Sequence, residues 1–157
     1  MIDKKQILKE LDQEFEKLKK ELGFNATLEE LDSVFGIKDS ILSNGFVGED
    51  LSRQISSKIS EAYYNWSSYL NSLILPNPSF MPSQTESKLF SIKEDKELLW
   101  ELINGAMKFV SKNSLDILKK DPVLQKEMID GSLEYWKNKF HPKTVQVMQK
   151  IHDSWSN

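Results

Sequence analysis

Apolar residues recur every three or four positions along most of this chain, which is the spacing of one face of an α-helix. The pattern predicts helices over residues 3–22, 28–42, 48–75, 92 to between 111 and 120, 122–140 and 142–155. No segment has the strict alternation of apolar and polar residues that is typical of a half-buried strand. We therefore expect an all-α fold, a single-domain bundle of five to six helices spanning residues 1–157.

Short polar motifs predict where these helices begin and end. Thr27 and Glu30 have the spacing of a capping box, in which each side chain bonds the backbone N–H of the other residue. Gly36 is expected to kink or split the helix that follows. The pair His141-Pro142 is expected to break the fifth helix, because proline lacks the N–H that a helix interior uses.

The longest predicted helix covers about residues 48–75, and its second half has apolar residues on two sides. A helix of this kind is usually central in its bundle. Pro76 ends it, and the proline-rich loop that follows carries Phe80 and Met81. Loops of this composition are normally on the surface, so two large apolar side chains there need an explanation.

Residues 62–85 contain no charged side chain, although 29% of the chain is charged. Burial in the long helix accounts for the first half of this stretch but not for the loop. Interface cores are rich in aromatic residues and Met and poor in charge. We therefore expect a non-enzymatic protein-interaction or scaffold domain that binds a protein partner, most simply a second copy of itself, through the uncharged region with Tyr64, Phe80 and Met81.

Arg53 is the chain's only arginine and is a further candidate for partner binding. A guanidinium can hold a carboxylate or phosphate through two parallel hydrogen bonds, which lysine does poorly. The alternative is a surface ion pair or a cap with the neighbouring Glu49 or Asp50.

Composition excludes several classes of chemistry. The chain has no cysteine, so disulfides, thiolate catalysis and cysteine-ligated zinc are ruled out. No apolar run reaches the length of a membrane-spanning helix, and the first residues lack the pattern of a signal peptide. We therefore expect a cytoplasmic protein with no membrane contact and no cofactor.

Charge argues against nucleic acid as a partner. Residues 1–50 hold seven Lys and twelve acidic residues, a net charge of −5, whereas contact with phosphates needs clustered basic residues. Residues 135–155 do interleave aromatic and basic residues. Trp136 and Phe140 lie four apart on the apolar stripe, however, so a core role with an ordinary solvated basic face is the simpler interpretation.

Four carboxylates offer an enzymatic alternative. Glu94 and Glu97 form one E-x-x-E pair, and Glu127 and Asp130 form an E-x-x-D pair. Two such pairs on facing helices can hold Mg²⁺. The arrangement resembles the metal-binding signature of all-α nucleoside-triphosphate pyrophosphatases, and this resemblance implies a Mg²⁺-dependent hydrolase. The alternative is that these acids lie near helix N-termini, where they complement the helix dipole and face solvent.

Residues 27–42 resemble a helix-turn-helix, and this resemblance implies DNA binding as a third possibility. Leu31, Phe35, Ile37 and Leu42 stand where that motif has apolar residues. Asp32 departs from the pattern, because it replaces a small apolar residue. The competing interpretation is a kinked core helix.

Overall fold

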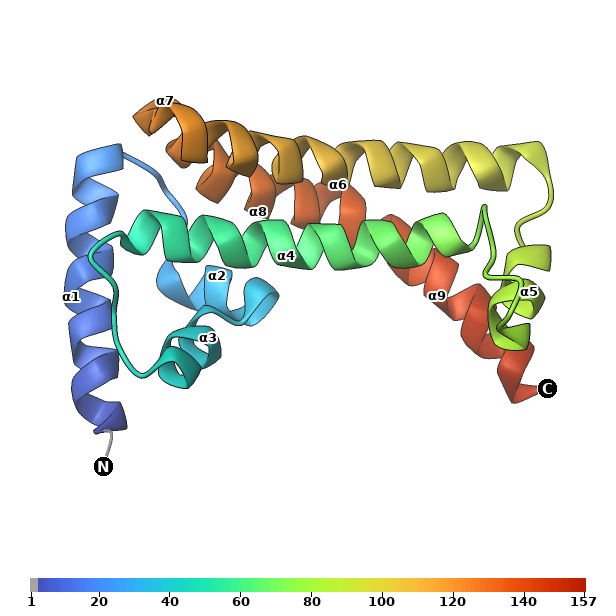
Figure 1. The fold of residues 1–157 in the computed structure, drawn as a ribbon, viewed down its shortest axis with the longest axis horizontal. Coiled ribbons are helices and arrows are strands. Elements are labelled where there is room, and N and C mark those ends of the chain that lie inside the picture. Colours follow the sequence, from blue (N-terminus) through green and yellow to red (C-terminus); the bar gives the residue numbers. More distant parts are fainter. Residues whose placement is uncertain (1–2) are drawn as a thin grey trace. The chain divides into compact units, whose positions relative to one another are not determined.

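The computed structural model describes residues 3–157, and in this range the chain forms helices and connecting loops but no strand. The α-helices, labelled in Figure 1, are α1 (Lys4–Leu22), α2 (Leu28–Phe35), α3 (Ile37–Asn44), α4 (Leu51–Ser72), α5 (Met81–Lys88), α6 (Lys93–Lys119), α7 (Pro122–Lys126), α8 (Ser132–Tyr135) and α9 (His141–Ser156). Two further helical elements, η1 (Glu127–Gly131) and η2 (Trp136–Phe140), flank α8. The elements η1 and η2 are π-helical turns. The all-α prediction is confirmed.

The number of helices differs from the prediction of five to six. Residues 122–156 are helical without a break, so the described part of the chain has seven continuous helical segments. Two segments are added, because Gly36 splits one predicted helix and residues 81–88 form α5. One is lost, because the predicted break at His141-Pro142 does not occur.

The helix runs through Pro142 because the preceding turn is π-helical. In η2 the His141 N–H bonds the Trp136 carbonyl, five residues back, and the backbone is wider there than in an α-helix. Proline normally disrupts a helix through its missing N–H and through a clash of its ring with the carbonyl four residues back. The wider turn relieves the clash of the proline ring with that carbonyl. Pro142 has no N–H to donate, so one backbone hydrogen bond is missing at this position of a helix that is otherwise continuous over residues 122–156.

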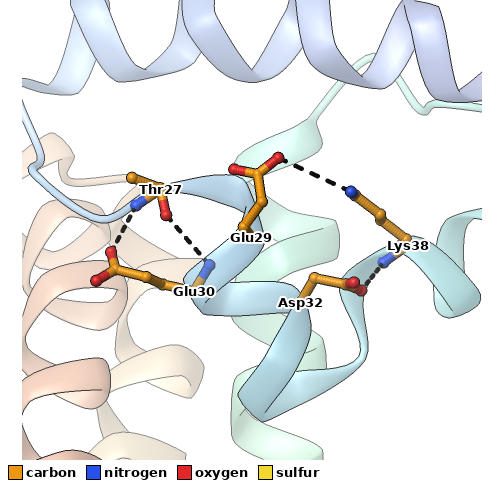
Figure 2. Close-up of polar contacts among 5 residues, drawn as sticks. All are labelled: Thr27, Glu29, Glu30, Asp32 and Lys38. Carbon is orange, nitrogen blue, oxygen red and sulfur yellow. Dashed lines mark hydrogen bonds and ion pairs between the residues drawn. The ribbon is translucent and has the colours of Figure 1, made fainter.

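Helix ends follow the local motifs elsewhere. The Thr27 hydroxyl accepts a hydrogen bond from the Glu30 N–H at 3.1 Å, and the Glu30 carboxylate accepts one from the Thr27 N–H at 3.0 Å, so the predicted capping box is confirmed (Figure 2). Gly36 has a φ of +66°, a left-handed conformation that favours glycine, and it separates α2 from α3. The long helix is shorter than predicted: α4 covers Leu51–Ser72 rather than residues 48–75.

The chain divides into two compact units. Unit 1 contains the described residues up to Ala62 together with Ser111–Glu134, and unit 2 contains Tyr63–Val110 and Tyr135–Asn157. The expectation of one domain over residues 1–157 therefore stays a prediction.

The core of unit 1 is built from one face of α1 and from the α2–α3 corner. Helix α1 buries residues four apart, Ile7, Leu11 and Phe15. Helices α2 and α3 meet at Gly36, and α3 packs against α1 (Figure 1). Fully buried Leu31 and Ile37 contribute the apolar side of that corner. Burial of this kind, rather than helix propensity, stabilises two helices of only eight residues each.

The core of unit 2 is an aromatic cluster around Tyr63. This side chain is fully buried, stacks on Phe109 with ring centroids 5.1 Å apart, and meets Phe140 edge-on at 5.5 Å. Tyr135 lies within 6.1 Å of Tyr63 and packs so closely on helix α6 that its hydroxyl occupies the space beside Gly105. Burial, and then the nearby Tyr135, raise the pKa of Tyr63 well above its ordinary value.

Candidate functional site

The uncharged stretch 62–85 has two parts, a helical half with buried side chains and a loop. In its helical half, Tyr63, Leu70 and Leu73 are buried in unit 2. After Ser72 the chain leaves α4, forms a loop and enters α5 at Met81 (Figure 1). The loop is the segment that burial does not explain.

Three large apolar side chains of this loop and of the first residue of α5 face solvent. Leu75 is 68% exposed, Phe80 is 56% exposed and Met81 is 78% exposed. Scattered exposed apolar residues are normal, but three within seven residues make a local apolar surface. We refer to Leu75, Phe80 and Met81 as the loop-tip surface.

Internal hydrogen bonds hold this loop in one conformation. The Ser83 hydroxyl accepts from the Asn77 N–H at 3.0 Å, and the Asn77 side chain accepts from the Ser79 N–H at 2.9 Å. The Gln84 side-chain amide donates to the Pro78 carbonyl at 2.6 Å. Because the loop satisfies its own polar groups, its apolar side chains are left on the outside of an ordered structure.

Further contacts fix the loop and α5 to the longer helices of unit 2. The Ser87 hydroxyl donates to the carbonyl of Leu73 at 2.8 Å. The Glu86 carboxylate accepts from the Tyr69 hydroxyl at 2.9 Å and from the Trp155 indole N–H at 3.0 Å, so it links α5 to α4 and to α9. Sequence reasoning missed this role, although Glu86 is the first charged residue after the uncharged stretch.

The other two predicted partner-binding residues lie elsewhere. Tyr64 is 57% exposed on α4, two turns before Ser72 and about 12 Å along the helix from its end. Arg53 is in unit 1 and exposed, and its backbone N–H donates to the Asp50 carboxylate at 3.0 Å. Arg53 lines a hollow together with Asp50, Glu61 and Lys58, and Lys58 pairs with Glu61 at 3.3 Å, so the charged residues there are two basic and two acidic.

The four carboxylates of the enzymatic alternative have separate surroundings. Glu94 is exposed in the first turn of α6, and Glu97 pairs with Lys93 at 3.7 Å in the same helix. Glu127 pairs with Lys112 at 2.9 Å. Asp130 accepts hydrogen bonds from the backbone of the loop between α1 and α2.

A metal site is not evident in this set. Within residues 3–157, no group of three or more His, Asp or Glu side chains lies together in a way that would hold a metal ion. The magnesium site therefore stays a prediction, without an observation of geometry that favours it.

Figure 2 shows the corner between α2 and α3, where the helix-turn-helix resemblance lies. A single residue, Gly36, joins the two helices. The Asp32 carboxylate accepts from the Lys38 N–H at 2.8 Å and so caps α3, which explains the departure from the motif's usual small apolar residue. Lys38, the only basic residue of α3, lies 3.8 Å from the Glu29 carboxylate. Lys38 is thus engaged in polar contacts within the corner through both its backbone N–H and its side chain.

Among the aromatic residues near the C-terminus, Phe140 has the predicted core position, whereas Trp136 is only partly buried. Phe140 is fully buried, and Trp136 stacks on it with ring centroids 5.3 Å apart. Lys143 pairs with Glu101 at 2.6 Å, and Lys150 pairs with Asp95 at 3.1 Å. Two of the basic residues in this stretch are therefore engaged in ion pairs within unit 2.

Comparison of the chain with known protein families, with curated proteins and with solved structures finds no match in any of the three. None of the helices in residues 3–157 combines the length and the apolar content that crossing a membrane requires. Arguments about function therefore rest on the residues themselves.

Proposed function

We propose that this chain is a non-enzymatic helical interaction domain that associates with a second copy of itself through the loop-tip surface. The proposal rests on one observation: the exposed apolar side chains belong to a segment whose backbone is held in one conformation. Leu75, Phe80 and Met81 face solvent from a loop whose polar groups are bonded within unit 2. A flexible loop would lose conformational entropy when a partner bound, whereas a loop already ordered avoids much of that cost.

A second copy suits this surface because the surface carries no charge. Most symmetric dimers use the same patch on both subunits, so residues near the two-fold axis face their own equivalents. A charged residue there would meet a like charge, which is unfavourable. Residues 62–85 contain no such residue, and Phe and Met are among the types enriched at interface cores.

The direct test is molecular mass in solution across the micromolar range, measured by sedimentation equilibrium or light scattering. The wild-type chain is expected to show a concentration-dependent dimer. Phe80→Lys introduces a like-charge pair at the centre of the proposed contact and is expected to give a monomer at every concentration. Since Phe80 is already 56% exposed, this substitution is expected to leave the fold intact.

A matched control distinguishes association through this surface from non-specific hydrophobic association. Leu118 is 82% exposed and belongs to unit 1, so Leu118→Lys makes the same apolar-to-cationic change in the other unit. It is expected to dimerise like the wild type. A wild-type chain that stays monomeric, or a dimer that Leu118→Lys abolishes as fully as Phe80→Lys does, contradicts the proposal.

A further inference from the structure

Unit 2 contains a pocket of about 330 Å³ that has no part in the proposed dimer contact. The indole rings of Trp66 and Trp136 form part of its wall, and helix α9 forms the rest. None of the loop-tip residues lines it. The sequence pattern assigned Trp136 to the core, but both tryptophans are only partly buried.

The α9 wall is one face of the helix. Residues spaced by four, three and four positions contribute to it: His141, Val145, Met148 and His152. At 1.5 Å per residue these span about 16 Å, or three turns. A volume of 330 Å³ spread over that length makes a narrow slot. Both histidines of the chain lie in this one wall, one at each end.

Both indole rings of the pocket pack against the buried ring of Phe140. Phe140 is fully buried, stacks on Trp136 at 5.3 Å with an interplanar angle of 28°, and meets Trp66 at 6.4 Å with an angle of 70°. Phe140 in turn packs against Tyr63 at 5.5 Å. A wall held in this way needs little rearrangement when a ligand binds, which favours affinity.

The backbone at the pocket is also unusual. Trp136 begins the π-helical turn η2, and His141 is the first residue after it. Such turns are rare, since they lose the regular hydrogen bonding of an α-helix, and they occur often at functional sites. Trp136 at the start of this turn and His141 directly after it both line the pocket, with ring centroids 6.0 Å apart.

The lining favours a neutral ligand. None of the described residues that line the pocket is Lys, Arg, Asp or Glu, so a charged ligand would lose its hydration without gaining an opposite charge. Trp66, Trp136, Val145 and Met148 supply apolar area. Hydrogen bonding is available from the two histidines and from Gln149, whose amide nitrogen is bonded to Asp153 at 2.8 Å while its oxygen is left to accept.

We propose that this pocket binds a neutral, planar aromatic small molecule about the size of two fused rings. Ligand pockets of proteins are typically about 300–1,000 Å³, lined mostly by apolar and aromatic side chains with a few polar groups, and this pocket is at the small end of that range. A flat ring fits a narrow slot and stacks on indole. This inference goes beyond the proposed dimerisation and does not depend on it.

The chain's own tryptophans provide the test. Four indole N–H groups give four signals in a ¹⁵N-labelled NMR spectrum, and unlabelled indole serves as the neutral bicyclic probe. Indole is expected to shift the signals of Trp66 and Trp136, which line the pocket, and to leave those of Trp100 and Trp155 in place. Indole-3-acetate has the same rings with a negative charge and is expected to bind at least about tenfold more weakly.

Two neighbouring substitutions on α9 complete the test. Val145 lines the pocket and is 47% exposed, so Val145→Glu is expected to fold normally and to weaken indole binding roughly tenfold or more by placing a carboxylate in the slot. Gln146 is exposed and outside the pocket, so Gln146→Glu adds the same charge and is expected to bind as the wild type.

The proposal is overturned if indole shifts none of the four signals up to its solubility limit, if it shifts all four alike, or if Val145→Glu binds it as tightly as Gln146→Glu. It is also overturned if a short tryptophan-containing peptide shifts the same two signals at concentrations tenfold lower than indole, because the pocket would then receive a side chain of a protein partner. Each of these results leaves the dimerisation experiment unaffected.

Discussion

The Tyr135 hydroxyl occupies the space in which a Cβ on Gly105 would lie. An alanine at position 105 would therefore overlap the phenol ring of Tyr135, whose other contacts are with Tyr63, Phe109 and Phe140. The glycine is required by a side chain rather than by the backbone, because α6 is an ordinary helix at this point.

Gly105→Ala is expected to lower the free energy of unfolding. Overpacking a well-filled site costs about 1–3 kcal/mol. Replacing glycine by alanine in a helix gains about 1 kcal/mol, which offsets part of that cost. A net destabilisation of about 1 kcal/mol, measured by urea denaturation, is the expected result.

The control for this prediction is a background in which Gly105→Ala is expected to change the free energy of unfolding in the opposite direction. In a Tyr135→Leu background the overlap is removed, and Gly105→Ala is expected to stabilise by its helix propensity alone. Asn104→Ala, at an exposed position one residue earlier, is expected to stabilise in both backgrounds. If Gly105→Ala stabilises the wild-type chain as much as the Tyr135→Leu chain, the packing argument is wrong.

Asp130→Asn is expected to destabilise unit 1. The Asp130 carboxylate accepts from the backbone N–H groups of Asn25 and Ala26, with three oxygen–nitrogen distances of 2.9 Å. An amide would turn an NH₂ group toward one of these donors. Hydrogen bonds to charged groups contribute about 1.5–3 kcal/mol, and a loss within that range is expected in urea denaturation without added metal.

Glu134→Gln is the matched comparison, because Glu134 is exposed and four residues along the same helical segment. It is expected to change the free energy of unfolding by less than about 0.5 kcal/mol. An equal effect of the two substitutions would show that general charge, rather than the contact with the backbone, is responsible. If instead added Mg²⁺ stabilises the wild type and not Asp130→Asn, the enzymatic alternative regains support.

Capping by Asp32 predicts a difference between two acidic residues of the α2–α3 corner. Asp32→Ala removes the hydrogen bond to the Lys38 N–H and is expected to cost about 1 kcal/mol, the usual cost of losing a cap. Asp39→Ala removes only a favourable charge in the first turn of α3 and is expected to cost about 0.5 kcal/mol or less. Equal losses in thermal denaturation would contradict the capping role.

Alkaline pH is expected to destabilise unit 2 through its tyrosines. Burial raises the pKa of Tyr63, Tyr69 and Tyr135, and the hydrogen bond and charge of Glu86 raise the pKa of Tyr69 further. Above the ordinary phenol pKa, the unfolded chain loses these protons while the folded chain keeps them. The folded state then binds more protons, so the free energy of unfolding falls as pH rises beyond about 10.

Denaturation measured at a series of pH values from 8 to about 11 tests this prediction. Tyr69→Phe removes one of the three groups and is expected to reduce the slope above the ordinary phenol pKa, although it also removes the hydrogen bond to Glu86. Lysines titrate in the same range but are common to both chains. An unchanged slope in Tyr69→Phe would exclude Tyr69 as a source of the effect.

Local motifs predicted local structure well. The capping box at Thr27 and the split at Gly36 depend on residues within a few positions of each other, and both are confirmed. Pro142 was predicted wrongly, because the rule that proline ends a helix assumes α-helical geometry in the preceding turn, and a π-helical turn has no clear signature in the sequence.

Features that depend on distant residues could not be read from the pattern. The contact of Asp130 with Asn25 joins positions 105 residues apart, and the pocket between Trp66 and α9 needs the packing of residues 75 to 86 positions apart. The exposure of Phe80 and Met81 was only partly foreseeable. The predicted loop position holds for Phe80, whereas Met81 is the first residue of α5. The hydrogen bonds of Asn77 and Gln84 that order the loop depend on its three-dimensional path.

The π-helical turn at Trp136–Phe140 holds one residue more than an α-helical path over the same height. It can be regarded as a single-residue insertion that the chain has absorbed without breaking the helix. In a strictly α-helical path an added residue would rotate the helix after it by about 100°. A π-helical turn instead takes up the extra residue locally, so the segments on either side of it keep their facing sides. Trp136 on one side of the turn and Val145 and Met148 on the other thus line one pocket.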